Sequence, residues 1–371
     1  MAASPSSLRS DNWNEADQLF GKLLPDEERW KDRQPFLESR GYMLRPRYRP
    51  GWIPSWTGST KNPIYFEDSQ VLPARQHLTD ATRIADGKLV YIKRVKTGDN
   101  ESQLATMLSS ESLRKDPRNK CVPILDLFQD SDDPSISYMV MPFLRLVDDP
   151  LFTIVEDVVD FVDQILEGLV FLHEVGVAHR DCSYKNVMMD ASAMYPHGHH
   201  PVKDMCLPDG ETEAIFLSRS SVPIKYYYVD FGISVHILPD VFPKLAVGQL
   251  GRDREPPELS ADAPYDPFKL DVFLIGNLFR HLLHDLYSNV EFLAALFGPM
   301  TEADPASRPD AREVLEQWHS IRKGLSFLNR RWGLRSRRER RNKFLLDASC
   351  FVKAVSYAVR QLFGWAVDVQ G

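Results

Sequence analysis

One stretch of the chain, HRDCSYKN at residues 179–186, carries side chains whose types and spacing suit phosphoryl transfer. Asp181 can orient or accept the proton of an attacking hydroxyl group, and Asn186 can hold a metal ion near the phosphates of a nucleotide. Asp230, in the segment YYYVDFG, offers a carboxylate that suits Mg²⁺. Lys93 ends the segment VYIK, and a lysine on such a strand can contact the α- and β-phosphates.

The elements that would position these side chains are strands in the first part of the chain and helices in the second. Strands are expected from β-branched and aromatic runs, and Asp86-Gly87 is a hairpin turn signal between two of them. Predicted strands lie within 64–95 and at 121–128, 137–143 and 187–190, and predicted helices at 99–110, 156–176, 268–287, 288–298 and 309–322. This order predicts an α+β fold of two lobes rather than alternating βαβ units.

The motifs resemble, in their order along the chain, those of the eukaryotic protein kinase family. The matching residues are Lys93, His179-Arg180-Asp181 with Asn186, and Asp230-Phe231-Gly232. Each short motif arises often by chance, but several in the correct order, each on the expected element, are specific. The resemblance covers residues 65–320. Within the family, the chain most resembles the divergent kinase-domain proteins of mushroom-forming fungi. The segments that carry this resemblance are GYMLRPRYRPGWIPSW, DPRNKCVPILD, AHRDCSYKNVMMD and MYPHGHHP.

This resemblance implies a bilobal protein kinase-like fold, with a small antiparallel-sheet N-lobe and a larger helical C-lobe. The implied reaction is transfer of a phosphoryl group from Mg-ATP to a protein hydroxyl, with Ser/Thr preferred to Tyr. The implied catalytic residues are Asp181, Lys93, Lys185 and Arg180. The implied nucleotide-binding residues are Lys93, Glu101, Met141, Pro142, Leu144, Asn186 and Asp230, of which Asn186 and Asp230 hold the metal. Glu111 is the alternative to Glu101 as the partner of Lys93.

Three further motifs have counterparts in the same family. PPE at 256–258 resembles the end of the activation segment, and Arg308 in DPASRP would pair with Glu258 and pin that segment. Asp271 in DVFLIG would brace the catalytic loop through its backbone. Residues 235–258 contain no Ser, Thr or Tyr, so activation by phosphorylation in this stretch is not expected. Asp240 or Asp253 could offer Arg180 a fixed acidic partner instead.

Two features on the nucleotide side depart from the family. Gly87 is the only glycine between Ser69 and Lys93, so the glycine-rich phosphate loop is missing. Tyr91 stands where the family usually has alanine beside the adenine. These departures favour a competing hypothesis, a pseudokinase that acts as a binding or scaffold module. A small-molecule kinase is a third hypothesis, opposed by Arg180, the DFG motif and the Glu258–Arg308 pair.

The predicted organisation is an N-terminal extension packed on the kinase-like domain, the domain itself and a tail. The ranges are 1–63 for the extension, 64–320 for the domain (N-lobe 64–143, C-lobe 144–320, insertion 191–225) and 321–371 for the basic and amphipathic tail. Prolines in RPRYRPGWIPSW (45–56) exclude a regular helix and predict an extended strip. Its aromatics either pack on the main domain or its arginines dock an acidic partner. His197, His199 and His200 in the insertion indicate a packed or solvated loop or, alternatively, a zinc site.

The composition sets the remaining expectations. Of the 371 residues 43% are hydrophobic, the net charge is −7, and the four cysteines show no disulfide or metal spacing. We therefore expect an intracellular protein, cytoplasmic or nuclear, without a membrane span and without a nucleic-acid partner. The resemblance to protein kinases implies a protein substrate, and we expect a monomer. Residues 319–343 hold ten Lys/Arg and one Glu, ahead of an amphipathic helical pattern at 344–371. That tail either docks on the domain or makes a weak peripheral membrane contact.

Overall fold

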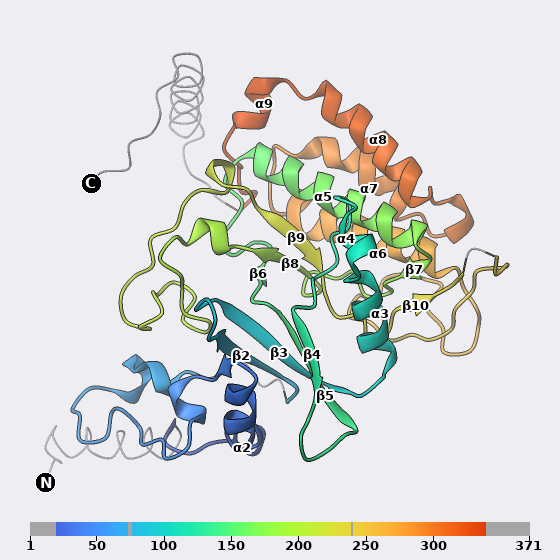
Figure 1. The fold of residues 1–371 in the computed structure, drawn as a ribbon. Coiled ribbons are helices and arrows are strands. Elements are labelled where there is room, and N and C mark those ends of the chain that lie inside the picture. The colour runs from blue at the N-terminus through green and yellow to red at the C-terminus, as the bar shows by residue number, and fades with distance from the viewer. Residues whose placement is uncertain (1–19, 73–75, 239, 339–371) are drawn as a thin grey trace, which may run out of the picture. The chain divides into compact units, whose positions relative to one another are not determined.

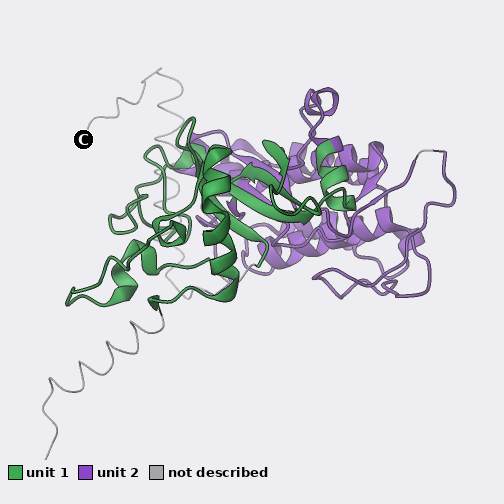
Figure 2. Cartoon of the chain, turned by 60° about the horizontal axis from the view of Figure 1, so that its bottom comes forward, with its two compact units in different colours: residues 1–106, 123–144, 190–217 green, residues 107–122, 145–189, 218–371 purple. Residues whose placement is uncertain are grey.

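The computed structural model describes residues 20–72, 76–238 and 240–338, and it divides into two compact units. The first unit contains the residues up to 106 together with 123–144 and 190–217, and the second contains 107–122, 145–189 and the chain from 218 onward (Figure 2). The first is built on an antiparallel sheet and the second is mostly helical. The mixed α+β architecture predicted from the sequence is therefore observed.

A five-stranded antiparallel sheet forms the frame of the first unit (Figure 1). In spatial order its strands are β1 (Tyr42–Met43), β2 (Leu78–Arg83), β3 (Leu89–Lys96), β5 (Ile136–Pro142) and β4 (Asp126–Gln129). The turn between β2 and β3 lies at Asp86-Gly87, as predicted, with Gly87 at a φ of 71°. A positive φ suits glycine because it has no Cβ to clash with the backbone.

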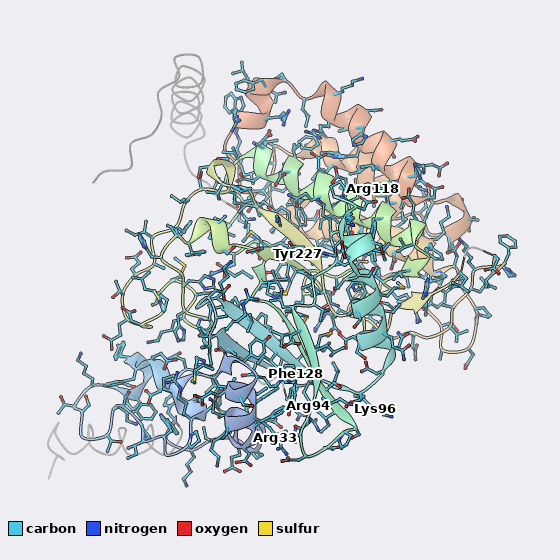
Figure 3. The ribbon with its side chains drawn as sticks, viewed as in Figure 1. Arg33, Arg94, Lys96, Arg118, Phe128 and Tyr227 are labelled. Atoms are coloured by element: carbon cyan, nitrogen blue, oxygen red, sulfur yellow. The ribbon has the colours of Figure 1, made fainter. Side chains whose placement is uncertain are left out.

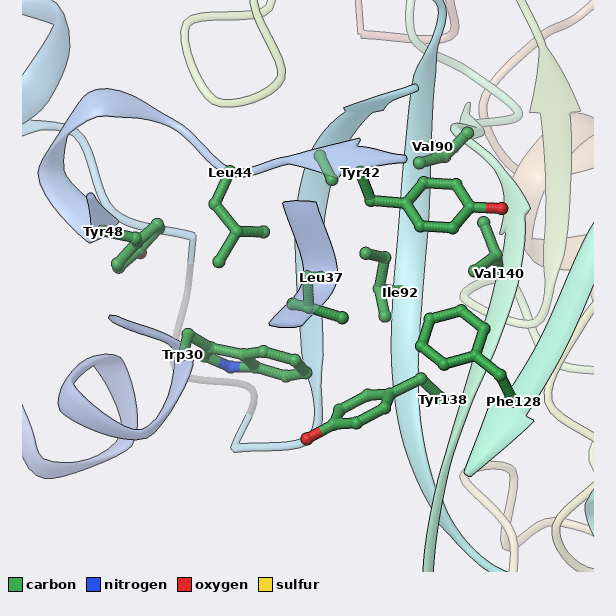
Figure 4. Packing of buried hydrophobic residues seen from close by; sticks show 11 residues of the cluster. Trp30, Leu37, Tyr42, Leu44, Tyr48, Val90, Ile92, Phe128, Tyr138 and Val140 are labelled. Carbon is green, nitrogen blue, oxygen red and sulfur yellow. The ribbon is translucent and has the colours of Figure 1, made fainter. Parts of the chain in front are cut away.

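Helix α2 (Pro25–Ser39), from the N-terminal extension, covers one face of this sheet. Its Trp30 and Leu37 join a buried cluster with Ile92 of β3 and with Tyr138 and Val140 of β5 (Figure 4). Burial of side chains of this size is the main favourable term in folding. The extension therefore supplies part of the hydrophobic core on which the sheet depends.

Charged side chains fix the same helix at its edges. Arg33 of α2 reaches the β4–β5 turn, where its Nε lies 3.2 Å from Asp130, and it also pairs with Asp132 (Figure 3). At the other side of α2, the buried Glu27 accepts from Arg47 Nε at 2.7 Å. Because a buried charge is costly unless it is paired, these contacts specify one position of the helix on the sheet.

The prediction of a strand at the start of residues 64–95 is wrong. Two short 3₁₀ turns, Pro63–Tyr65 and Glu67–Ser69, occupy the region, and the first strand after them is β2. The Asn62 side chain accepts from the N–H of Ile64, and the Asp68 carboxylate accepts from Ser55 N and Trp52 Nε1. Such side chain–backbone bonds compete with strand pairing.

The extended strip predicted at 45–56 is also wrong, because Pro46–Tyr48 form a 3₁₀ turn. Its aromatics do pack, since Tyr48 and Trp56 are buried. Arg45 donates from Nε to Asp80 at 2.8 Å, beside the Glu27–Arg47 pair described above. The packing hypothesis for this stretch is therefore the one that the structure favours over docking of an acidic partner.

Helices dominate the second unit. They are α5 (Val155–Glu174), α6 (Pro267–Phe279) continued by a π-helical turn at Arg280–His284, α7 (Ala294–Met300), α8 (Ala311–Gly324) and α9 (Phe327–Arg331), with α4 at Glu111–Arg114. Helices α5 and α8 lie side by side (Figure 1). The apolar stripe predicted for α5, Val158, Val162, Ile165, Leu169 and Leu172, is fully buried. The helix predicted at 288–298 is shorter than expected, because residues 291–293 form a 3₁₀ turn before α7.

Short strands carry the loops of the second unit. One sheet has the order β6 (Arg145–Leu146), β8 (Val187–Asp190) and β9 (Lys225–Tyr228), and β7 (Val177–Ala178) pairs with β10 (Val235–His236). Helix α3 spans Asn100–Leu108. Within the described ranges no helix is both long and apolar enough to cross a membrane. The helical pattern predicted at 344–371 lies outside the described residues.

Replacing Leu37 with alanine tests whether the extension belongs to the core. Leu37 is 0% exposed, so Leu37→Ala removes buried surface and leaves a cavity, and the free energy of unfolding should fall by about 2–5 kcal/mol. Urea denaturation followed by tryptophan fluorescence measures this loss. Ile53→Ala is the control, because Ile53 lies in the same extension and is 73% exposed. Equal stability of the two variants would contradict the packing described here.

Candidate functional site

Lys93 and Glu101 are brought together in the first unit. Lys93 Nζ lies 2.5 Å from Glu101 Oε1, and both side chains are largely buried. Val90 and Ile92 on β3 point into the core under α2, so Lys93 projects from the opposite face of the sheet. Glu111, the alternative partner, is 89% exposed and pairs with Lys115. The geometry therefore favours Glu101 over Glu111.

Tyr91 shares the face of β3 that carries Lys93. Its ring stacks on that of Phe143, with centroids 4.3 Å apart, and it pairs in register with Met141 of β5. The N–H of Phe143 donates to Leu89 O at 3.4 Å, which continues the pairing past the end of β5. Met141 and Leu144 are buried and Pro142 is half-buried. The large ring predicted to crowd a nucleotide thus has a defined aromatic partner.

Asp181, Asn186 and Asp230 gather in the second unit. Asn186 Nδ2 donates to Asp181 Oδ2 at 2.7 Å, and the N–H of Val229 donates to Asn186 O at 2.9 Å. That backbone bond places Asp230, an exposed residue with a φ of 66°, directly after the contact with Asn186. Non-glycine residues seldom adopt a positive φ, and such residues cluster at functional sites.

Asp271 of α6 holds the loop that begins at His179. It is 0% exposed, and its two oxygens accept from the N–H groups of His179 at 2.7 Å and Arg180 at 2.6 Å. His173 Nε2 lies 3.2 Å from the same carboxylate. Arg180 has a φ of 66°, so the loop needs such bonds to stay in a strained conformation. The bracing role expected for Asp271 is geometrically present.

The Arg180 guanidinium ties the loop to the segment that follows Asp230. It donates to Ile233 O at 3.1 Å, Val247 O at 2.7 Å and Tyr265 Oη at 2.7 Å. The expectation of an acidic partner is wrong for the described residues. Asp253 instead accepts from Asn277 Nδ2 at 2.8 Å. Neutral acceptors replace a carboxylate because the segment folds back to present its carbonyl groups.

The end of that segment is anchored by a buried ion pair. Arg308 donates from its two terminal nitrogens to the two oxygens of Glu258, at 2.5 and 2.9 Å. It also donates to Glu302 O at 2.7 Å and Lys269 O at 3.1 Å. Bidentate pairing with additional carbonyl contacts satisfies most of the guanidinium donors, which offsets the cost of burying it.

Gly251, which the sequence reasoning missed, lies against the candidate site. Its φ is 129°, and a Cβ there would lie 3.3 Å from Arg180 O and 3.6 Å from Asp181 Oδ1. This close approach lets the N–H of Arg252 donate to Asp181 Oδ1 at 2.9 Å. Asp181 therefore accepts one bond from its own loop and one from the later segment. The signal available in the sequence was a glycine within residues 235–258, which contain no Ser, Thr or Tyr.

The histidines of the insertion have protein partners. His200 Nδ1 accepts from the N–H groups of Val202 and Lys203, so its Nε2 carries the hydrogen and lies 3.1 Å from Glu67 Oε1. The His199 ring packs 5.5 Å from that of Phe143 and 4.8 Å from that of Tyr195. With both ring nitrogens of His200 engaged, the packed-loop hypothesis accounts for these residues better than zinc binding does.

Asp271→Asn tests whether Asp271 holds the loop that begins at His179. An amide can turn only one oxygen toward the two buried N–H groups, and its NH₂ group then faces the other donor. The free energy of unfolding should fall by about 2 kcal/mol or more. Thermal or urea denaturation measures the change. Asp262→Asn, an exposed acid of the same unit, should leave stability unchanged, and an equal loss in both variants would remove the special role of Asp271.

Tyr265→Phe tests whether the segment after Asp230 is held without a phosphate. The hydroxyl accepts from Arg180 and donates to Gly248 O at 2.5 Å, so its loss removes two of the bonds that hold residues 247 and 248 against Arg180. Backbone amides of residues 246–252 should exchange with deuterium about tenfold faster. Tyr287→Phe is the control, because that hydroxyl bonds to no other described residue. An activating phosphate found by mass spectrometry within 235–258 would contradict this arrangement.

The chain has no match among the models of known protein families, and no curated protein is significantly similar to it. Any functional assignment therefore depends on the geometry of its own residues. The structure brings the predicted residues into two groups, Lys93 with Glu101 in the first unit and Asp181 with Asn186 beside Asp230 in the second.

Proposed function

We propose that this protein is an ATP-dependent protein kinase with a bilobal kinase-like fold, which transfers the γ-phosphoryl group of Mg-ATP to a protein hydroxyl, Ser or Thr in preference to Tyr. The observation that carries the proposal is the orientation of Asp181. Its carboxylate is held by Asn186 Nδ2 and by the N–H of Arg252, on a loop braced by the buried Asp271. A carboxylate fixed from two sides can meet the proton of an incoming hydroxyl without first reorganising.

The Lys93–Glu101 pair supports the nucleotide side of the proposal. Glu101 holds the Lys93 ammonium at 2.5 Å on the face of the sheet opposite α2. An ammonium fixed in this way can contact the α- and β-phosphates of ATP. Met141, Pro142 and Leu144, at the end of β5, would contact the adenine. Lys185 is exposed four residues after Asp181 and would contact the transferred phosphoryl group.

The donor set of Asn186 and Asp230 fits Mg²⁺. The amide NH₂ group of Asn186 donates a hydrogen bond to Asp181, so the Oδ1 atom of Asn186 would be the one that binds a cation. Asp230 adds a carboxylate. Among the described residues no cluster of three His, Cys, Asp or Glu side chains could hold a metal alone. Mg²⁺ in phosphoryl-transfer sites usually takes one or two protein ligands and completes its shell with water and phosphate. When bound, it would neutralise charge on the phosphates.

One observation favours the second candidate, a pseudokinase. The stacked rings of Tyr91 and Phe143 lie on the face of the sheet that carries Lys93, and such bulk opposes nucleotide binding there. A small-molecule kinase is less well supported, because the Glu258–Arg308 anchor fixes a segment suited to a polypeptide substrate.

We further propose that the protein acts in the cytoplasm or nucleus as a monomer. Its tail beyond residue 338 lies outside the described residues and could add a weak membrane contact.

A paired measurement of ATP binding and phosphoryl transfer tests the proposal. The wild type should show a thermal shift with Mg-ATP and should phosphorylate a protein or peptide pool. Lys93→Met and Asp181→Asn should each reduce transfer by about 100-fold or more. Lys96→Met is the matched control, since Lys96 lies on the same strand and is exposed, and it should keep full activity.

The outcomes separate the hypotheses. A thermal shift without transfer would favour the pseudokinase, and neither shift nor transfer would overturn the kinase proposal. Transfer that survives Asp181→Asn would show that the reaction uses another site. Transfer to small alcohols in preference to peptides would favour the small-molecule kinase.

A further inference from the structure

A groove in the second unit is lined by residues that closely follow Asp181 in the chain and by Arg252, whose N–H bonds to the Asp181 carboxylate. Its volume is about 720 Å³, and its walls include Ser183 and Lys185 of the catalytic loop and residues 252–255 of the later segment. The N–H of Arg252 donates to Asp181, so the residues of this wall are fixed relative to the reacting group. A polypeptide lying in the groove would present its hydroxyl to Asp181.

The basic residues of the groove are available to a partner. Lys185, Arg252 and Arg254 are exposed. Throughout residues 20–72, 76–238 and 240–338, no carboxylate lies within ion-pairing distance of these three side chains. An exposed cation without an internal partner can pair with a carboxylate of another chain at little cost in free energy, because no ion pair within the protein has to be broken first.

The acidic residues of the groove are already engaged within the unit. Asp148 accepts from the hydroxyl of Tyr184, and Asp253 accepts from Asn277 Nδ2 and from the N–H of Glu255. Glu255 itself pairs with Arg280 and lies 2.9 Å from His281 Nε2. Their charges are thus partly neutralised or bound to fixed donors, and the groups that can move toward a ligand are the cations.

The floor of the groove is apolar. Leu274 and Leu278 lie four residues apart on α6 and share one face of it. Leu282 lies on the π-helical turn that continues α6, and Leu286 follows just after that turn. Three of them are buried and Leu286 is half-buried, so the floor offers a shallow apolar contact rather than a deep pocket.

We propose that this groove selects protein segments in which acidic residues flank the acceptor hydroxyl and an apolar side chain lies nearby. The inference rests on the proposed kinase function and adds its substrate class. Carboxylates of the segment would pair with Arg252 and Arg254, and the apolar side chain would contact the leucines. The overall charge of −7 makes this local concentration of unpaired cations a specific feature rather than a general surface property.

Three serine peptides that differ only in their flanking residues test the inference. One has aspartates, one asparagines and one lysines, and each carries a leucine near the serine. The wild type should phosphorylate the aspartate peptide with a kcat/KM about tenfold above that of the asparagine peptide. The double variant Arg252→Glu, Arg254→Glu keeps the backbone N–H that contacts Asp181, and its preference should disappear or pass to the lysine peptide. Lys225→Glu, an exposed cation of the same unit outside the groove, should keep the wild-type preference.

Fluorescence anisotropy with the aspartate peptide separates this inference from the proposed function. Transfer that depends on Asp181 but is equal for all three peptides would overturn the inference and leave the kinase proposal in place. Binding that is lost in the double variant, without transfer, would support the groove and overturn the kinase proposal. Tighter binding of a single-stranded RNA than of the aspartate peptide would overturn the assignment of a protein partner.

Discussion

The buried carboxylate of Asp271 is the interaction on which the second unit depends. An unpaired charge inside a protein is costly, and here two backbone N–H groups and His173 approach it from one loop and one helix. Because both N–H groups belong to consecutive residues, the carboxylate dictates the path of the chain there. That path includes the positive φ of Arg180, directly before Asp181. The position of this loop and the strain in its backbone at Arg180 therefore both follow from its contacts with Asp271.

The first unit has a corresponding constraint at its edge, the Glu27–Arg47 pair. Both side chains are nearly inaccessible, and Tyr48 Oη donates to the same carboxylate at 3.1 Å. The pair joins α2 to the turn that follows β1, so the extension and the sheet share one core rather than meeting at a surface.

Local signals explain which parts of this structure the sequence could predict. Helix α5 is long and strictly periodic, and the β2–β3 turn depends on two adjacent residues, Asp86 and Gly87. The segment 64–72 has the same β-rich composition but becomes 3₁₀ turns, because the side chains of Asn62 and Asp68 take up backbone and indole donors. Composition does not reveal such bonds, since they depend on which distant groups come near.

The candidate site likewise contains features that the sequence could predict and features that it could not. Motif order along the chain named Lys93, Asp181 and Asn186 as candidates, and Glu101 was the preferred partner of Lys93. The position of α3 then shows Glu101 paired with Lys93 and Glu111 paired with Lys115. The partners of Arg180 were not predictable, because backbone carbonyls leave no trace in residue types. Their use has a consequence for the segment they hold. Carbonyl groups satisfy Arg180, while the acidic side chains of the segment, Asp253, Glu255 and Glu258, bond elsewhere in the second unit. Arg252 and Arg254 are needed for neither set of contacts and stay exposed.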